Sequence, residues 1–227
     1  MKNTTTEKLL QNNNPDKIIK TLSPYLTEQR KSRIESVLQH RLESITLAVE
    51  HPSDINNALA SIRTCEALGI ATIHIISPEQ DTQYIHSITK SAFYWVNIIF
   101  HNHLKDFLVV MKHEKRIITG ATINAEKKLS EISIEKPICI LIGNEKRGLS
   151  REAKSACDIL FSIPMCGMVE SLNLSVAAAI SLFDVSERKR AQLKNKTDLS
   201  ENMAQKLRAK YYLNSVDVRL AVSLLCA

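Results

Sequence analysis

The chain has few cysteines, and their arrangement argues against two classes of protein. Five cysteines occur in 227 residues, an odd number, and no two of them have the Cys-x-x-Cys spacing. This pattern disfavours a disulfide framework and a zinc ribbon, and it fits a reducing compartment. No apolar run approaches the roughly 18 residues of a membrane span, and residues 1–7 lack the apolar core of a secretory signal. We therefore expect a cytoplasmic protein without a membrane segment.

Glycine is also scarce, at five residues in 227, or about 2% against roughly 7% in an average chain. Because glycine alone tolerates tight turns and close backbone approach, we expect each one to serve such a place. No pair fits G-x-G-x-x-G or G-x-x-x-x-G-K-[ST], which excludes the dinucleotide fingerprint and the P-loop. The five are Gly69, Gly120, Gly143, Gly148 and Gly167.

The chain carries a net charge of +6, which favours a polyanionic partner. Residues 187–219 contain nine Lys and Arg against four Asp and Glu, so this stretch alone contributes nine minus four, or +5. Two interpretations are open: a solvated helix face, or an appendage that contacts nucleic-acid phosphates.

Short apolar runs alternate with helical periodicity, which predicts an α/β fold with a mostly parallel sheet and helices on both faces. We expect a helical extension over residues 1–43, a central domain over 44–185, and a basic helical extension over 186–227. Asn14-Pro15, Thr27, Asp54 and Ser150 are predicted helix starts. Predicted strands cover 45–49, 71–76, 94–100, 117–119, 138–142 and 159–163, and the other predicted helices cover 104–111 and 172–193.

Three segments combine polar residues with turns at the ends of predicted strands. They cover residues 57–64, 142–150 and 163–175. In parallel sheets, ligands bind at the loops that follow the strands. Each segment also has an ordinary explanation, since Arg63 suits an exposed helix face, the second segment a tight turn, and Ser171 a helix N-cap.

Together, the three segments resemble motifs one to three of the SPOUT superfamily of S-adenosylmethionine-dependent RNA methyltransferases. They read Asn-x₅-Arg-Thr, Gly-Asn-Glu-x-x-Gly-Leu-Ser and Ile-Pro-Met-x-Gly-x-x-x-Ser-Leu-Asn-x-Ser, in that order. Within the superfamily the chain is most similar to the SpoU-type 2′-O-ribose methylases, and its extensions are most similar to those of members that methylate guanosine 18 of tRNA. The resemblance implies a C-terminal deep trefoil knot, a homodimer, S-adenosyl-L-methionine as cofactor, tRNA as partner, and no metal.

The resemblance also assigns site residues. Two features of the first motif need explanation. Leu59 stands where the family usually has Ser or Gly, so it either narrows the substrate side or packs in the core. Asn57 lies about 120° from Arg63 on a regular helix, so we expect it at the helix start, outside regular geometry. The implied catalytic residues are Asn57, Arg63, Glu145, Ser171 and Asn173, and the implied cofactor-binding residues are Gly120, Gly143, Ile163, Met165 and Leu172.

An arginine, with a pKa above 12, is a poor base. We therefore expect Arg63 to act as a forked donor that holds a phosphate and stabilises alkoxide charge. Glu145 and Asn173 would orient Arg63 and the loops, and Ser171 would fix the third motif. His101-Asn102-His103 has no carboxylate or cysteine companion, so we predict no metal site there.

Other functions remain open at this point. One is 2′-O-methylation of ribosomal RNA or of another tRNA position. Another is a non-catalytic knotted RNA-binding protein, although such a protein would have no reason to keep all five polar residues of the three motifs. A methylase of small molecules is disfavoured by the basic tail.

Overall fold

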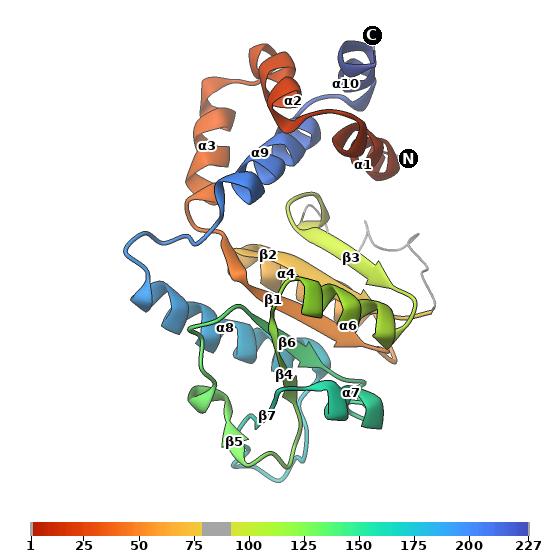
Figure 1. The fold of residues 1–227 in the computed structure, drawn as a ribbon, viewed down its shortest axis with the longest axis vertical. Coiled ribbons are helices and arrows are strands. Elements are labelled where there is room, and N and C mark those ends of the chain that lie inside the picture. Colours follow the sequence, from red (N-terminus) through yellow and green to blue (C-terminus); the bar gives the residue numbers. More distant parts are fainter. Residues whose placement is uncertain (1, 79–91, 227) are drawn as a thin grey trace. The chain divides into compact units, whose positions relative to one another are not determined.

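The computed structural model describes residues 2–78 and 92–226, and the chain forms two compact units. The larger unit is Leu42–Lys194, and the smaller one combines Met1–Arg41 with Asn195–Ala227. In its described part the larger unit contains a seven-stranded sheet in which every pair of neighbours is parallel (Figure 1). The strands are β1 (Leu42–Glu50), β2 (Ile70–Ile76), β3 (Asn97–His101), β4 (Ile117–Ala121), β5 (Lys127–Lys128), β6 (Ile138–Ile142) and β7 (Ile159–Ser162).

The strand order is β3-β2-β1-β6-β4-β7-β5. The chain first adds β2 and β3 on one side of β1 and then crosses over to build the other half of the sheet. In such sheets ligands bind where the strand order reverses, beyond the carboxyl ends of the strands. The loops that follow β1, β4, β6 and β7 meet at that edge, because these four strands are consecutive neighbours in the sheet.

Helices cover both faces of the sheet. One face packs against α4 (Ile55–Ala67) and α8 (Leu174–Gln192), which bury Leu59, Ile62 and Leu182 in the main core. The other face packs against α6 (Leu104–His113) and α7 (Arg151–Ala156), which bury residues such as Phe107 and Ala153. The predicted α/β architecture with a parallel sheet is confirmed. The described part of this unit also contains two 3₁₀ helices, η3 (Ala92–Tyr94) and η4 (Leu129–Glu131).

Several predicted boundaries differ from the observed ones, and three of them are instructive. The strand expected over 94–100 begins only at Asn97, because residues 92–94 form η3. The helix expected from Leu172 begins at Leu174, because Asn173 is its N-cap and its side chain accepts a hydrogen bond from the Ser175 N–H. The helix that Thr27 caps ends at Leu38, three residues before Arg41.

The smaller unit is a helical assembly in which α9 packs against α1, α2 and α3. Leu207, Tyr211 and Leu213 of α9 are buried there. The two terminal segments that the sequence analysis treated separately therefore share one core, and the larger unit extends to Lys194 because α8 belongs to it. The elements are α1 (Lys2–Asn12), α2 (Pro15–Leu22), η1 (Ser23–Tyr25), α3 (Glu28–Leu38), α9 (Glu201–Ser215) and α10 (Val218–Leu225).

Much of the positive charge near the C-terminus serves packing. In the larger unit, Arg188 pairs with Asp184 at 2.7 Å, and Lys189 donates to the Ile134 carbonyl at 3.0 Å. In the smaller unit, the Arg208 guanidinium donates to both carboxylate oxygens of Glu35, at 2.6 and 2.8 Å. Lys210 is half-buried, and its desolvation lowers its pKa to about 8.

Two histidines form a buried pair on the face of the sheet that α6 covers. His74 Nδ1 lies 3.0 Å from His101 Nε2, and both rings contact Phe107 edge-on. Burial, and then the nearby His101 and Arg116, lower the pKa of His74 to about 3. The pair is therefore neutral at physiological pH.

This pair predicts a specific loss of stability in acid. The folded state holds His74 neutral while the unfolded chain protonates it near pH 6.5, so stability from this group is full above pH 6.5 and falls as the pH drops towards 3. The His74→Asn variant keeps a polar group near the position of Nδ1 but cannot titrate. In urea denaturation, the wild type should lose up to about 1.4 kcal/mol more per pH unit than the variant below pH 6.5. Parallel curves for the two proteins would contradict the prediction.

Candidate functional site

The loop between β6 and α7, residues 143–150, is folded tightly on itself. Asn144 and Gly148 exchange backbone hydrogen bonds of 3.0 and 2.8 Å, and the Asn144 carboxamide oxygen accepts from the N–H groups of Lys146 and Arg147. Gly148 has φ +65°, a left-handed conformation that favours glycine. Gly143 has no room for a side chain, because a Cβ there would overlap the backbone of Gly148 and Leu149. The loop is therefore a preformed turn.

The turn after β1 anchors this loop at both ends. Glu50 is 2% exposed, and its carboxylate accepts hydrogen bonds from the N–H of Ser150 at 2.9 Å and from its hydroxyl at 2.6 Å. At the other end, the Asn144 side chain donates to the His51 carbonyl at 2.6 Å. His51 has φ +43°, a strained conformation for a residue with a Cβ, and we infer that this bond helps to hold it. Buried carboxylates and strained turns persist where such partners satisfy them.

Three of the predicted catalytic residues lie together in one chain of hydrogen bonds. The Asn57 side chain donates to Glu145 Oε1 at 2.9 Å, and the Asn173 side chain donates to Asn57 Oδ1 at 3.1 Å. The Ser53 N–H donates to the second oxygen of Glu145 at 2.7 Å. Asn57 lies in the first turn of α4, two residues inside its start, so the expectation that it stands outside regular helix geometry was wrong.

The environment keeps Glu145 ionised. Burial acts to raise its pKa, but hydrogen bonds from backbone N–H groups, including that of Ser53, and from the Asn57 amide outweigh burial and place the pKa below its ordinary value. Glu145 is therefore suited to hold hydrogen-bond donors in place, and poorly suited to deliver a proton near neutral pH.

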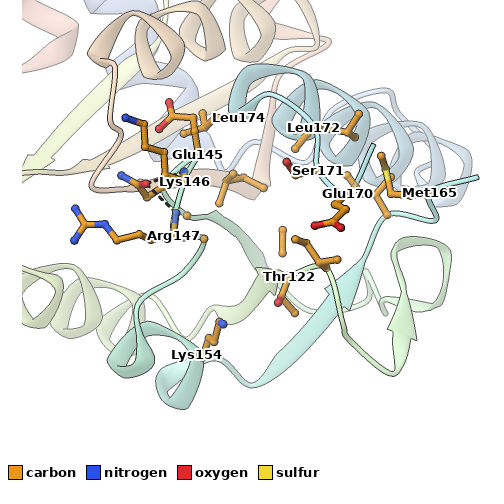
Figure 2. A pocket seen from close by; sticks show the side chains of 18 residues that line it. Thr122, Glu145, Lys146, Arg147, Lys154, Met165, Glu170, Ser171, Leu172 and Leu174 are labelled. Carbon is orange, nitrogen blue, oxygen red and sulfur yellow. Dashed lines mark hydrogen bonds between the residues drawn. The ribbon is translucent and has the colours of Figure 1, made fainter. Parts of the chain in front are cut away.

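A cavity of about 360 Å³ opens beside this network, between the loops that follow β4, β6 and β7 (Figure 2). Its size is in the range of small-molecule sites. The lining includes four of the five predicted cofactor residues and two of the predicted catalytic ones. These are Gly143, Ile163, Met165, Leu172, Glu145 and Ser171.

Other predicted residues lie elsewhere. Gly120 is buried in β4 and is not among the lining residues; a Cβ there would meet Cys157 Sγ at 2.5 Å, under α7. Arg63 is exposed on α4, outside the cavity lining, and contacts no hydrogen-bond partner in the described part of the chain. Leu59 is fully buried, so of its two expected roles it packs in the core. Its bulk does not narrow the site.

Several residues of the site were not predicted from the motifs. Glu50 and Asn144 form the anchors described above, and Thr122 and Ile123 line the cavity after β4. Asn144 stands within the second motif, directly before Glu145, so its position could have indicated a role. Glu50 ends an apolar strand, and a carboxylate at that point gave no comparable signal. In the described residues, no group of three His, Cys, Asp or Glu side chains is arranged to hold a metal ion.

The similarity to known proteins covers all three motifs. The SpoU rRNA Methylase family matches residues 44–183, which is more than half of the chain. The chain belongs to the SpoU methylase family. The prediction that the three motifs made is thus confirmed.

Individual relatives of this SpoU methylase include a "tRNA (guanosine(18)-2'-O)-methyltransferase" of Borreliella burgdorferi, which is 33% identical over 86% of this chain and 90% of that protein. The crystal structure of an A. aeolicus TrmH/SpoU tRNA modifying enzyme has a TM-score of 0.73 and 29% identity, and covers 84% of this chain and 98% of that one. A "23S rRNA (guanosine-2'-O-)-methyltransferase RlmB" of Nitrosomonas europaea is 29% identical over 69% of this chain but only 61% of its own length.

The turn geometry of this SpoU methylase predicts different effects for two glycines. Gly143→Ala should destabilise the protein by about 3 kcal/mol, because the added Cβ meets backbone that cannot rotate away. Gly167→Ala is the matched control, since a Cβ there meets nothing within 4 Å, and its effect should stay within about 0.5 kcal/mol. Thermal unfolding of both variants checks this, and equal melting temperatures would contradict the turn as described.

Proposed function

We propose that this protein transfers a methyl group from S-adenosyl-L-methionine to a ribose 2′-hydroxyl of tRNA, at guanosine 18 of the D-loop. One observation carries the proposal: the three motifs are joined by the Glu145–Asn57–Asn173 hydrogen bonds beside a cavity of small-molecule size. The tRNA-methylating relative supports tRNA over ribosomal RNA, because the two chains match over almost their full lengths. The ribosomal-RNA relative has a large part with no counterpart here.

The residues present fit the cofactor. The cavity joins apolar side chains, such as Ile142, Ile163 and Leu172, with polar ones, such as Thr122 and Ser171, and this mixture suits a purine and its ribose. When bound, the cofactor supplies a methyl group that its sulfonium already activates. We also propose that the loops after β6 and β7 form the trefoil knot of the family, and that the protein works in the cytoplasm.

The chain's own residues then have distinct roles. Glu145 remains an anion and fixes the Asn57 amide, and Asn57 in turn holds Asn173 at the start of α8. Ser171 lies at the cavity with an exposed side chain. Arg63 has its planar fork of donors available to grip a phosphate and the reacting oxygen together. These roles mainly position the hydroxyl for in-line attack, which is the chief need when the methyl group is already activated.

The main competing function is 2′-O-methylation of ribosomal RNA or of another tRNA position, and a non-catalytic RNA-binding protein is the second alternative. The experiment that separates these functions incubates the protein with radiolabelled S-adenosylmethionine and total RNA, and maps the labelled ribose. Label in tRNA at guanosine 18 supports the proposal in full. Label in ribosomal RNA or at another tRNA position supports an alternative substrate, and absence of label together with RNA binding supports the non-catalytic function.

The role of Arg63 predicts a contrast between two substitutions. If the planar fork is required, charge alone does not replace it, so Arg63→Lys should lower single-turnover methylation on the order of 10²–10³-fold. Cofactor affinity and folding should stay unchanged, because Arg63 is exposed and outside the cavity lining. Turnover of Arg63→Lys that is retained and rises with pH would indicate a base instead, and near-normal turnover of Arg63→Ala would remove this residue from the mechanism.

We propose a homodimer that covers the outer face of α8. Val176, Ile180 and Phe183 lie on this face at helical spacing and are 44%, 39% and 58% exposed, while the opposite face of α8 packs in the core. Apolar residues on both sides of a helix are typical of one that is buried on both sides.

The dimer predicts a change in mass on a charge substitution. Ile180→Glu with Phe183→Glu should convert a protein of twice the chain mass into one of 25.6 kDa, measured by size-exclusion chromatography with light scattering. Val109→Glu on α6 is the control, because Val109 is 68% exposed and lies on another helix. A wild-type protein that is monomeric at all concentrations would refute this interface.

A further inference from the structure

The loop after β6 and the helix that follows it carry an unusual concentration of free positive charge. Lys146, Arg147, Arg151 and Lys154 fall within nine residues. All four side chains are exposed, and none of them makes an ion pair or a side-chain hydrogen bond within the described residues. Lys146, Arg147 and Lys154 line the cavity. We call these three residues the mouth cations.

Carboxylates lie near the mouth cations, including Glu152 on the same helix as Lys154, but none forms an ion pair with them within the described residues. Glu145 is already bound to Ser53 and Asn57. Glu170 lines the cavity from the loop after β7, and Figure 2 shows it across the cavity from Lys146 and Arg147. The C-terminal cations that initially suggested nucleic-acid binding differ in this respect, since Arg188, Lys189 and Arg208 are engaged inside their own units.

The backbone that carries the mouth cations is fixed in advance. Asn144 Oδ1 accepts from the N–H groups of Lys146 and Arg147, and the Asn144–Gly148 bridge closes the loop. Lys154 stands on α7, whose N-cap Ser150 is tied to Glu50. Figure 2 shows the three side chains leaving in different directions around the cavity. Binding a ligand here therefore orders side chains alone, with the backbone already in place.

The proposed reaction brings a polyanion to this place. A ribose whose 2′-oxygen reacts at the cavity carries a phosphate on the adjacent 3′-oxygen and another on its 5′ side. These phosphates must pass the cavity mouth whatever base the nucleotide bears. Lys and Arg are the side chains that neutralise nucleic-acid phosphates.

We propose that the mouth cations bind the RNA backbone phosphates on either side of the methylated ribose, and that Arg151 extends the same surface. This inference rests on the proposed function and adds a phosphate-binding surface from the second motif to the role expected of Arg63. Contacts of this kind fix the register of the RNA without reading its sequence. Selection of one guanosine then depends on other parts of the protein.

The test compares two triple variants with equal charge loss. The first is Lys146→Gln, Arg147→Gln, Lys154→Gln. The control is Lys105→Gln, Lys112→Gln, Lys136→Gln: these three lysines are exposed and have no ion pair within the described residues, and two lie on α6 and one before β6. Fluorescence anisotropy with labelled tRNA gives the affinity at several salt concentrations, and calorimetry gives the affinity for S-adenosylmethionine.

We expect the first variant to bind tRNA at least about tenfold more weakly and to lose roughly one unit of salt slope per phosphate contact, up to about three. Its affinity for S-adenosylmethionine should stay within about twofold of wild type, and the control should keep most of its tRNA affinity. Equal losses in both variants would show an effect of net charge alone and would overturn the inference.

Two further outcomes are also decisive. A loss of S-adenosylmethionine affinity with unchanged tRNA binding would assign the mouth cations to the cofactor's carboxylate and overturn the phosphate assignment. Wild-type tRNA affinity and methylation in the first variant would overturn the inference alone and leave the proposed function standing. If the wild type itself binds no S-adenosylmethionine and methylates no RNA, both fall together.

Discussion

The site depends on the attachment of the β6–α7 loop to the turn that follows β1. Polar groups at the edge of a sheet must find partners when they leave water, and here the buried Glu50 carboxylate, the His51 carbonyl and the Ser53 N–H find theirs in Ser150, Asn144 and Glu145.

The attachment links two strands that are neighbours in the sheet but lie about ninety residues apart in the chain. The strand order reverses between β1 and β6, which is where a ligand crevice is expected. The attachment therefore forms a wall of the expected crevice.

A series of hydrogen bonds connects this attachment to the other two motifs. Glu145 is fixed by Ser53, Asn57 by Glu145, and Asn173 by Asn57. A chain of charge-assisted and amide hydrogen bonds of this kind polarises each member by its neighbour, so the loss of one bond weakens the others. The lowered pKa of Glu145 is one expression of this, since an ionised carboxylate is the stronger acceptor.

The positive charge of the chain has two separate uses. Some cations stabilise the fold: Arg188, Lys189 and Arg208 donate hydrogen bonds to carbonyl and carboxylate oxygens within their own units. The mouth cations have no such partners in the part of the chain that the structure describes, although the net charge counts both sets alike. An inference from charge to nucleic-acid binding therefore needs the partners of each cation, which the sequence does not give.

Much of the fold could be predicted from local signals. Asn14, Thr27, Asp54 and Ser150 cap their helices as expected, because a side-chain oxygen before an apolar repeat satisfies the same unpaired N–H groups in any fold. Strands such as β6 could be predicted because all five residues are apolar, and the structure buries all five.

The exceptions have different physical causes. Asparagine is a poor residue for a helix interior, and the structure shows that Asn173 is the cap of α8, so the helix starts after it. The partnership of Glu50 with Ser150 joins residues one hundred positions apart, and no local pattern predicts it. Arg63 matches its motif and yet lies outside the cavity, because motif spacing fixes residue identity and helix phase but not which surface the helix presents to the site.

Asn173 shows how folding and the site are connected in this protein. Its carboxamide oxygen accepts from the N–H and hydroxyl of Ser175, in the first turn of α8, while its amide nitrogen donates to Asn57. The oxygen of the side chain thus caps the N-terminus of a nineteen-residue helix that packs in the core. Its nitrogen forms the last of the hydrogen bonds that run from the turn after β1 through Glu145 and Asn57. Aspartate would cap the helix equally well, but it has no donor for Asn57. The requirement for both a donor and an acceptor at one position explains why asparagine, an otherwise weak helix residue, is suited to this place.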